Sequence, residues 1–137
     1  MDSTSCQVRC LMVDVRRYFG NDYEQVKSWF LARKMVPPPE DLLPKNGVIM
    51  DGIAAGFLYL TDSSVAIIDG YISNKDSVKH ERDQAIDKLT LELISIAKAK
   101  GFKIIKADTM IKSVGNRAAL HGFIELGWHN SYVKELH

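Results

Sequence analysis

The sequence of 137 residues predicts a single α/β domain, residues 1–137, in which helices flank a mixed β-sheet. Two observations predict this fold class. Three apolar runs separated by turn signals indicate antiparallel strands near residues 47–50, 53–60 and 65–73. A long amphipathic helix then separates the third run from another apolar run, and such a strand–helix–strand unit requires a right-handed crossover and a parallel pair of strands. The length suits one domain with one core.

The N-terminal part of the chain predicts a strand, a helix and an extended connection. Val8–Val15 is apolar and β-branched, which is typical of a strand. Asn21 or Asp22 can cap the helix that follows, in which four residues repeat at helical spacing: Val26, Trp29, Phe30 and Arg33. Three consecutive prolines remove backbone donors, so Val36–Gly47 is expected to be extended and semi-rigid.

Turn and helix signals divide the rest of the chain. Asp51-Gly52 predicts a hairpin turn, and the polar Thr61–Ser64 predicts a second turn. A polar loop is expected over residues 74–84. A long amphipathic helix overlaps its end and runs over residues 82–101, with Gly101 as its left-handed stop. The remaining elements are a strand over 102–109, a helix over 115–126 and a last strand over 128–136.

The overall charge points to no particular class of partner and rules none out. The chain has 18 basic and 17 acidic residues, for a net charge of +1, so nothing in the totals points to nucleic acid, an anionic membrane or an acidic partner. No apolar run is long enough to cross a bilayer, and the N-terminus does not resemble a signal peptide. Cys6 and Cys10 are interpreted as small apolar residues in a reduced, cytoplasmic protein.

The C-terminal motif gives the sequence a family resemblance. The stretch NRAALHGFIELGW places Asn116, Ala119, Phe123 and Gly127-Trp128 at the spacing Asn-x-x-Ala-x-x-x-aromatic-x-x-x-Gly-aromatic. With this order of elements it resembles the GNAT superfamily of N-acetyltransferases over Val8–Leu136. The short LLPKNG lead-in and the compact size also resemble small GNAT-like proteins encoded by bacteriophages.

The resemblance implies an acetyl-coenzyme A site. Asn116, Ala119 and Phe123 would meet the cofactor. Two neighbouring strands of the family diverge, and the pantetheine arm pairs with the backbone exposed there, which maps onto Tyr71, Ile72 and Ser73. A backbone N–H near Ile72 would polarise the thioester carbonyl.

The phosphate-binding loop departs from the family pattern Arg/Gln-x-x-Gly-x-Gly/Ala. Aligned at the expected start of the long helix, the stretch Arg82–Asp87 matches it with Arg82, Gln84 and Ala85 as cofactor-binding candidates. Asp87 replaces the second glycine, and its charge would oppose a phosphate by about 3 kcal/mol at 5 Å. The alternative is that Asp87 is an ordinary residue of the first helical turn. Cations of the loop (Lys75, Lys79, His80 and Arg82) either bind phosphate or are simply solvated.

The catalytic candidates are Asp69 and Tyr132. Phe123 occupies the position at which the family usually has a tyrosine that protonates the leaving thiolate, and phenylalanine has no proton to give. Tyr132, on the last predicted strand, is a substitute or a packing residue. Asp69 interrupts an apolar strand and is either the general base, with a pKa raised by burial, or a bulge residue before Gly70. His121 is expected to be a partly exposed residue of the last helix, and no metal site is expected.

The predicted function is acetyl-CoA-dependent N-acetylation of an amine, protein or small molecule, by direct attack on the thioester. Trp29, Phe30 and Pro37–Pro39 would line the acceptor side, as in the family. An alternative is a catalytically degenerate GNAT-fold protein with a binding or phage accessory role. A nucleic-acid-binding α/β module has little support, and homodimerisation, common in such folds, is left open.

Overall fold

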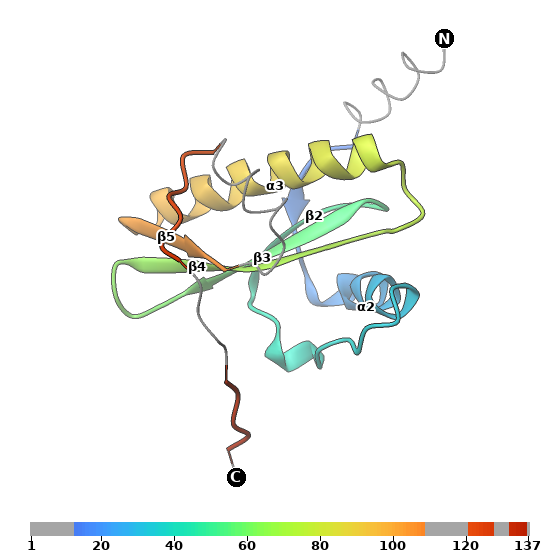
Figure 1. Ribbon diagram of the computed structural model, residues 1–137, viewed down its shortest axis with the longest axis horizontal. Coiled ribbons are helices and arrows are strands. Elements are labelled where there is room, and N and C mark those ends of the chain that lie inside the picture. The colour runs from blue at the N-terminus through green and yellow to red at the C-terminus, as the bar shows by residue number, and fades with distance from the viewer. Residues whose placement is uncertain (1–12, 109–120, 128–131, 137) are drawn as a thin grey trace.

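The computed structural model describes residues 13–108, 121–127 and 132–136. Up to and including the strand that follows the long helix, the helices and strands come in the order that the sequence predicts (Figure 1). In chain order they are β1 Arg16–Arg17, the 3-10 helix η1 Gly20–Asp22, α2 Tyr23–Ala32, the 3-10 helix η2 Glu40–Leu42, β2 Asn46–Met50, β3 Ala54–Leu60, β4 Val65–Ser73, α3 Lys79–Ala99 and β5 Ile104–Ala107. The three predicted meander strands, the two helices and both turns are confirmed.

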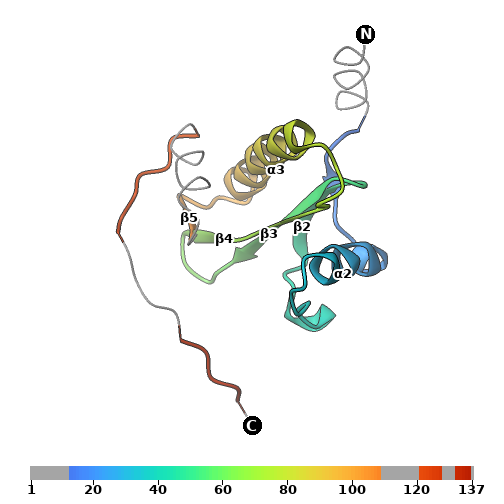
Figure 2. The same ribbon diagram turned by 45° about the vertical axis from the view of Figure 1, so that its right-hand side comes forward.

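The described strands form one mixed sheet in the order β1-β2-β3-β4-β5. Neighbours from β1 to β4 are antiparallel, whereas β4 and β5 are parallel because α3 connects them. Figure 2 shows α3 on one face of the sheet and α2 on the other. The mixed fold class predicted from the sequence is therefore confirmed.

Each face of the sheet has its own core. The α3-side core includes Val48, Met50, Leu58, Ala66, Ile68, Leu89 and Leu93. The α2-side core includes Val26, Trp29, Ile49, Ala55, Phe57 and Ile72. Successive residues of a strand point to opposite faces, so β2 and β3 are apolar at nearly every position rather than at alternate ones.

A β-bulge interrupts the pairing of β3 with β4. Gly56 pairs with Tyr71 and Leu58 pairs with Ile68, so Asp69 and Gly70 together face a single residue of β3. Gly70 has φ +96°, which glycine adopts at little cost. The extra residue shifts the alternation by one, as bulges do. For this reason Ile68 lies in the α3-side core and Ile72 in the α2-side core.

A network around Arg16 ties the first strand to α2 and the β2–β3 turn. The Arg16 guanidinium donates to both carboxylate oxygens of Asp22 (2.9 and 2.7 Å) and of Asp51 (2.9 and 2.7 Å). Asp22 is buried and also accepts the Phe19 N–H at 2.8 Å. Arg16 therefore holds the pKa values of both carboxyls below their ordinary range.

The two ends of the chain differ from expectation. Of the predicted strand Val8–Val15, residues 8–12 lie outside the described part; 13–15 are not a strand, and pairing starts at Arg16 instead. The predicted helix over 115–126 falls largely outside the described residues, and its described end, 121–126, is not helical. The described residues 132–136 are not in a strand either. None of the described helices combines the length and apolar character needed to span a bilayer.

Candidate active site

The second half of β4 extends beyond its partner β5. The parallel pairing runs from Val65↔Ile104 to Ile68↔Ala107, where β5 ends. Residues Asp69–Ser73 therefore pair with β3 alone among the described strands. We call Asp69–Ser73 the open half of β4. It includes Tyr71, Ile72 and Ser73, which the sequence predicts to meet the pantetheine arm.

The backbone groups of the open half alternate in direction. The Asn74 N–H donates to the Ile53 carbonyl at 2.8 Å, so residue 74 points its backbone toward β3. In an antiparallel pair, residues two apart point the same way, so Ile72 also faces β3, whereas Tyr71 and Ser73 face the open edge. The Ile72 N–H is directed into the sheet, and its side chain is buried. This orientation favours Tyr71 and Ser73 over Ile72 as backbone partners of the cofactor, and the contact itself stays a prediction.

The loop after β4 is shorter than the sequence suggested. Helix α3 begins at Lys79, so only residues 74–78 connect it to β4. Val78 occupies the N-cap and makes no side-chain cap. Valine has no acceptor atom, so it cannot satisfy the first N–H groups of α3, which have no acceptor inside the helix. Backbone N–H groups and the positive dipole end favour an anion at this end of α3, whereas the buried Glu81 in the first turn opposes one.

The alignment of Arg82–Asp87 with the phosphate loop is wrong. Asp87 is eight residues into α3, about 12 Å along the axis from its start. The expected repulsion between Asp87 and a phosphate at the helix end therefore disappears. Ala85 is fully buried in the α3-side core, and Gln84 bonds to His80 at 3.1 Å on the helix surface. Neither residue offers a free backbone N–H to a phosphate, because both lie beyond the first turn of the helix, where N–H groups bond within the helix.

Two arginines organise the loop and the end of β4. Arg82 donates to the Lys75 carbonyl at 3.0 Å and to the Ser77 carbonyl, so it orders the loop from inside α3. Arg33, at the end of α2, donates to the Ser73 carbonyl at 3.0 Å and to its hydroxyl at 2.7 Å. The sequence contained no signal for this second contact, since it joins residues 40 positions apart.

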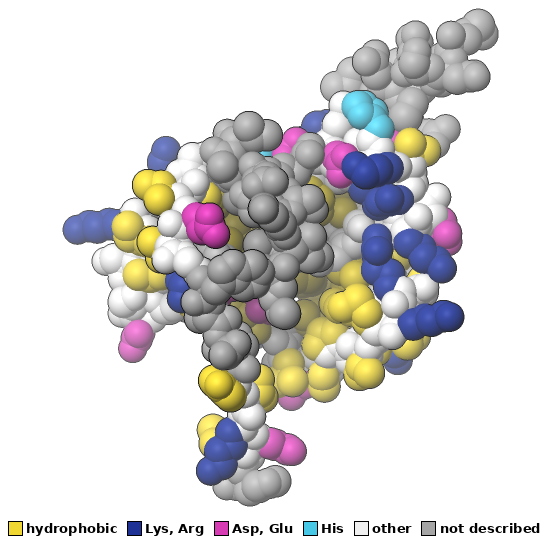
Figure 3. Space-filling view, viewed as in Figure 1, with side chains coloured by type: hydrophobic (Ala, Val, Ile, Leu, Met, Phe, Trp, Pro, Cys, Tyr) yellow, Lys and Arg dark blue, Asp and Glu magenta, His cyan; other side chains and the backbone are white. Residues whose placement is uncertain are grey.

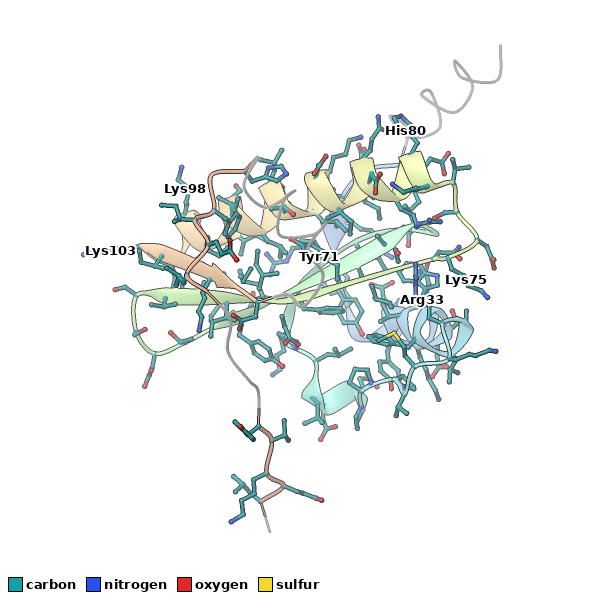
Figure 4. The ribbon with its side chains drawn as sticks, viewed as in Figure 1. Arg33, Tyr71, Lys75, His80, Lys98 and Lys103 are labelled. Carbon is teal, nitrogen blue, oxygen red and sulfur yellow. The ribbon has the colours of Figure 1, made fainter. Side chains whose placement is uncertain are left out.

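Positive charge gathers where these elements meet. Figure 3 shows lysine and arginine side chains clustered over the end of β4 and the start of α3. In Figure 4, Arg33 and Lys75 lie on this side of the molecule, and Lys98 and Lys103 lie at the opposite end. Lys79 is there too but pairs with Asp83 at 2.9 Å. The cluster would attract an anionic ligand to the open half of β4.

Asp69 lies at the bulge, on the side of η2. Partial burial raises the pKa of its carboxyl, and a hydrogen bond with Tyr59 opposes that rise. The same hydroxyl lies 3.0 Å from the Leu42 carbonyl oxygen of η2, a second acceptor for its one proton. Asp69 is still an exposed residue, so it remains accessible to a substrate. The interpretation of Asp69 as a bulge residue is therefore confirmed, whereas its role as a general base stays a prediction.

A second polar group lies on the α3 side. His121 Nε2 is 3.0 Å from Asp87 Oδ1, and both side chains are partly buried. The Tyr71 hydroxyl bonds to Thr90 at 2.6 Å. Burial raises the pKa of Tyr71, the bond with Thr90 lowers it, and the charge of Asp87 raises it further. His121 is partly exposed, as predicted, but it lies in a turn rather than a helix. The sequence did not predict its pairing with Asp87, because that contact joins distant parts of the chain.

Several predicted site residues are not brought to the open half. Tyr132 is 90% exposed and is not in a strand, contrary to the predicted last strand, and its catalytic role stays a prediction. Asn116 and Ala119 lie outside the described residues. Phe123 packs against the α3-side core. Trp29 is 5% exposed within the α2-side core, so it does not line an acceptor site, and Phe30 packs against that core.

Comparison with solved structures identifies the fold. An acetyltransferase from Trypanosoma brucei superposes with a TM-score of 0.60 at 14% identity, over 90% of this chain and 99% of the other. The chain has the fold of this acetyltransferase. A possible acetyltransferase from Clostridium difficile superposes with a TM-score of 0.55 at 10% identity, over 91% and 99% of the two chains. No family model and no curated protein matches the sequence.

Proposed function

We infer that this protein is an N-acetyltransferase that uses acetyl-coenzyme A and transfers the acetyl group directly to an amine. The observation that carries this proposal is the open half of β4, which pairs on one side only among the described strands and leads to the start of α3, where Val78 makes no side-chain cap. A pantetheine arm needs a backbone edge to pair with, and a pyrophosphate needs N–H donors and cations. The acetyltransferase fold of the two similar structures supports the same conclusion.

Each part of the cofactor has a counterpart along this path. The pyrophosphate would meet the first N–H groups of α3 and the cations Lys75 and Arg33. The pantetheine would pair with the backbone of Tyr71 and Ser73, which faces the open edge. The Tyr71 N–H, rather than that of Ile72, would then polarise the thioester carbonyl as charge develops on its oxygen.

Asp69 is the proposed general base. It would take a proton from the ammonium of the acceptor, directly or through water, and release a neutral amine for attack on the carbonyl carbon. Its raised pKa brings it closer to the pH at which proton transfer is useful. The acceptor would then approach from the side of η2, where Tyr59 contacts Leu42.

Isothermal titration calorimetry with acetyl-coenzyme A tests the proposal. We expect binding in the micromolar range, weakened by salt because the cluster of cations contributes. Desulfo-coenzyme A should bind similarly, and pantetheine alone should bind far more weakly. No heat of binding at millimolar acetyl-coenzyme A would refute the enzyme and favour a binding protein with this fold.

A further inference from the structure

The pair Asp87–His121 has the geometry of a proton-transfer group. The His121 Nε2 atom faces Asp87 Oδ1 at 3.0 Å, with 15% and 34% of the two side chains exposed. A carboxylate that accepts from one ring nitrogen fixes the imidazole tautomer and leaves the other nitrogen for chemistry. Here Nε2 carries the proton toward Asp87, and Nδ1 is the nitrogen left to exchange a proton.

The pair lies near the open half of β4. Asp87 is close enough to Tyr71 for its charge to raise the pKa of the tyrosine. Tyr71 belongs to the open half and is itself fixed to α3 through Thr90. Phe123, two residues after His121, packs against the α3-side core, so this segment of chain lies against the same part of the molecule. Asp87 on α3 and Tyr71 on β4 are the titratable groups that the described structure places around His121.

The reaction needs an acid that the motif lacks. When the neutral amine attacks the thioester, the C–N bond forms and the attacking nitrogen of the tetrahedral intermediate releases a second proton to water. The C–S bond then breaks and the sulfur leaves as a thiolate. The resemblance assigns its protonation to a tyrosine, but this chain has Phe123 at that position. A histidine held by a carboxylate is the commonest alternative proton donor in proteins.

We propose that His121, oriented by Asp87, protonates the leaving thiolate of coenzyme A, a role that rests on the proposed function. The proton passes from Nδ1 of the imidazolium to sulfur, giving the free thiol and a neutral imidazole. The imidazole regains its proton from solvent before the next cycle. Asp87 stays charged throughout and acts as the positioning residue.

Four variants test this assignment: His121→Gln, Asp87→Asn, the double variant His121→Gln/Phe123→Tyr and the control Glu92→Gln, an exposed carboxylate on the same helix. Thiol release from acetyl-coenzyme A is measured with tetralysine as acceptor, and cofactor affinity by calorimetry. We expect His121→Gln to lower kcat about 100-fold and Asp87→Asn about tenfold, with cofactor Kd within twofold of wild type. Adding Phe123→Tyr to His121→Gln should raise kcat at least tenfold. Glu92→Gln should change neither kcat nor the cofactor Kd.

The outcomes distinguish a failure of the His121 assignment from a failure of the proposed acetyltransferase function. If wild type binds and turns over acetyl-coenzyme A but His121→Gln keeps kcat within twofold, only the acid assignment fails. It also fails if the variant loses cofactor affinity and thermal stability in parallel and Phe123→Tyr restores nothing, since the pair is then a structural contact. If wild type does not bind acetyl-coenzyme A, or binds it without thiol release, the proposed function fails and this assignment fails with it.

Discussion

The two halves of β4 differ in almost every physical respect, although nine consecutive residues make up the strand. The first half, Val65–Ile68, is apolar and lies between β3 and β5. The open half carries a carboxylate, a glycine, a tyrosine, an isoleucine and a serine, and among the described strands it pairs only with β3. The first half stabilises the sheet, and the open half presents backbone and side-chain groups for binding.

The bulge explains how one strand has both properties. Asp69 and Gly70 face one residue of β3, which turns the following side chains to the other face. Gly56 on β3 assists, because a Cβ there would lie 2.9 Å from the Tyr71 ring. Tyr71 can therefore lie over β3 and reach Thr90. A regular strand would have placed Ile72 on the same face as Ile68.

The largest expected effect is a loss of stability on substitution of a buried residue in the first half of β4. Ile68 is 3% exposed in the α3-side core, so Ile68→Ala should lower the free energy of unfolding by about 2–5 kcal/mol. Urea denaturation measures this loss. Ile104→Ala on β5, where the side chain is 59% exposed, is the control and should cost less than about 0.5 kcal/mol. A loss below 1 kcal/mol for Ile68→Ala would show that this half is not the structural one.

Asp69→Asn should affect turnover and leave stability intact. Loss of the base should lower kcat about 100-fold, whereas the amide removes the desolvation cost that raises the carboxyl pKa, so the melting temperature should stay level or rise. The wild-type rate should increase with pH as Asp69 loses its proton, and the variant should lack that rise. Asp62→Asn in the β3–β4 turn is the matched control. Full turnover by Asp69→Asn would leave Asp69 as a bulge residue only.

Arg33→Ala should weaken cofactor binding about tenfold, because it removes a charged donor pair from the end of the open half. Lys103→Ala removes a cation at the opposite end of the molecule and serves as the control (Figure 4). Calorimetry at two salt concentrations measures both. Equal effects of the two variants would mean that only the total charge matters, not the place at which β4 ends.

The Arg16 network shows the opposite electrostatic behaviour to Asp69. The pKa values of Asp22 and Asp51 are lowered, so their contribution to stability is complete above the unfolded value of about 4 and is lost as the pH falls through the folded values. Because Arg16 and Asp51 are partly exposed, the loss should be about 1 kcal/mol. Unfolding measured from pH 6 to pH 2 should show it, and Asp22→Asn should reduce it. A flat profile in wild type would contradict this account.

The sequence predicted the strands of the meander and both main helices because their apolar patterns and turn residues are local. It misplaced the start of α3 by three residues, since Val78 is not a typical N-cap and gives no local signal. That error moved Asp87 from the middle of the helix to its end. The contacts of Arg33 with Ser73 and of His121 with Asp87 join distant residues, so no local pattern could reveal them.

Tyr132 shows the limit of transferring roles by resemblance. The apolar stretch that contains it predicted a strand, but Tyr132, Val133 and Leu136 are at least 86% exposed in the structure. Strand propensity depends on a neighbouring strand and a face to cover, and a single sequence does not say whether either is present. The bacteriophage origin, the cytoplasmic location, the acceptor and the dimer remain predictions.

An amide-resolved NMR titration with acetyl-coenzyme A tests the central claim most directly. The account predicts shift changes at the backbone amides of Tyr71 and Ser73 and at Lys79 and His80, with little change at Val65–Ile68. Shift changes that spread evenly along β4, or that leave the start of α3 untouched, would contradict the assignment of the open half as the cofactor edge.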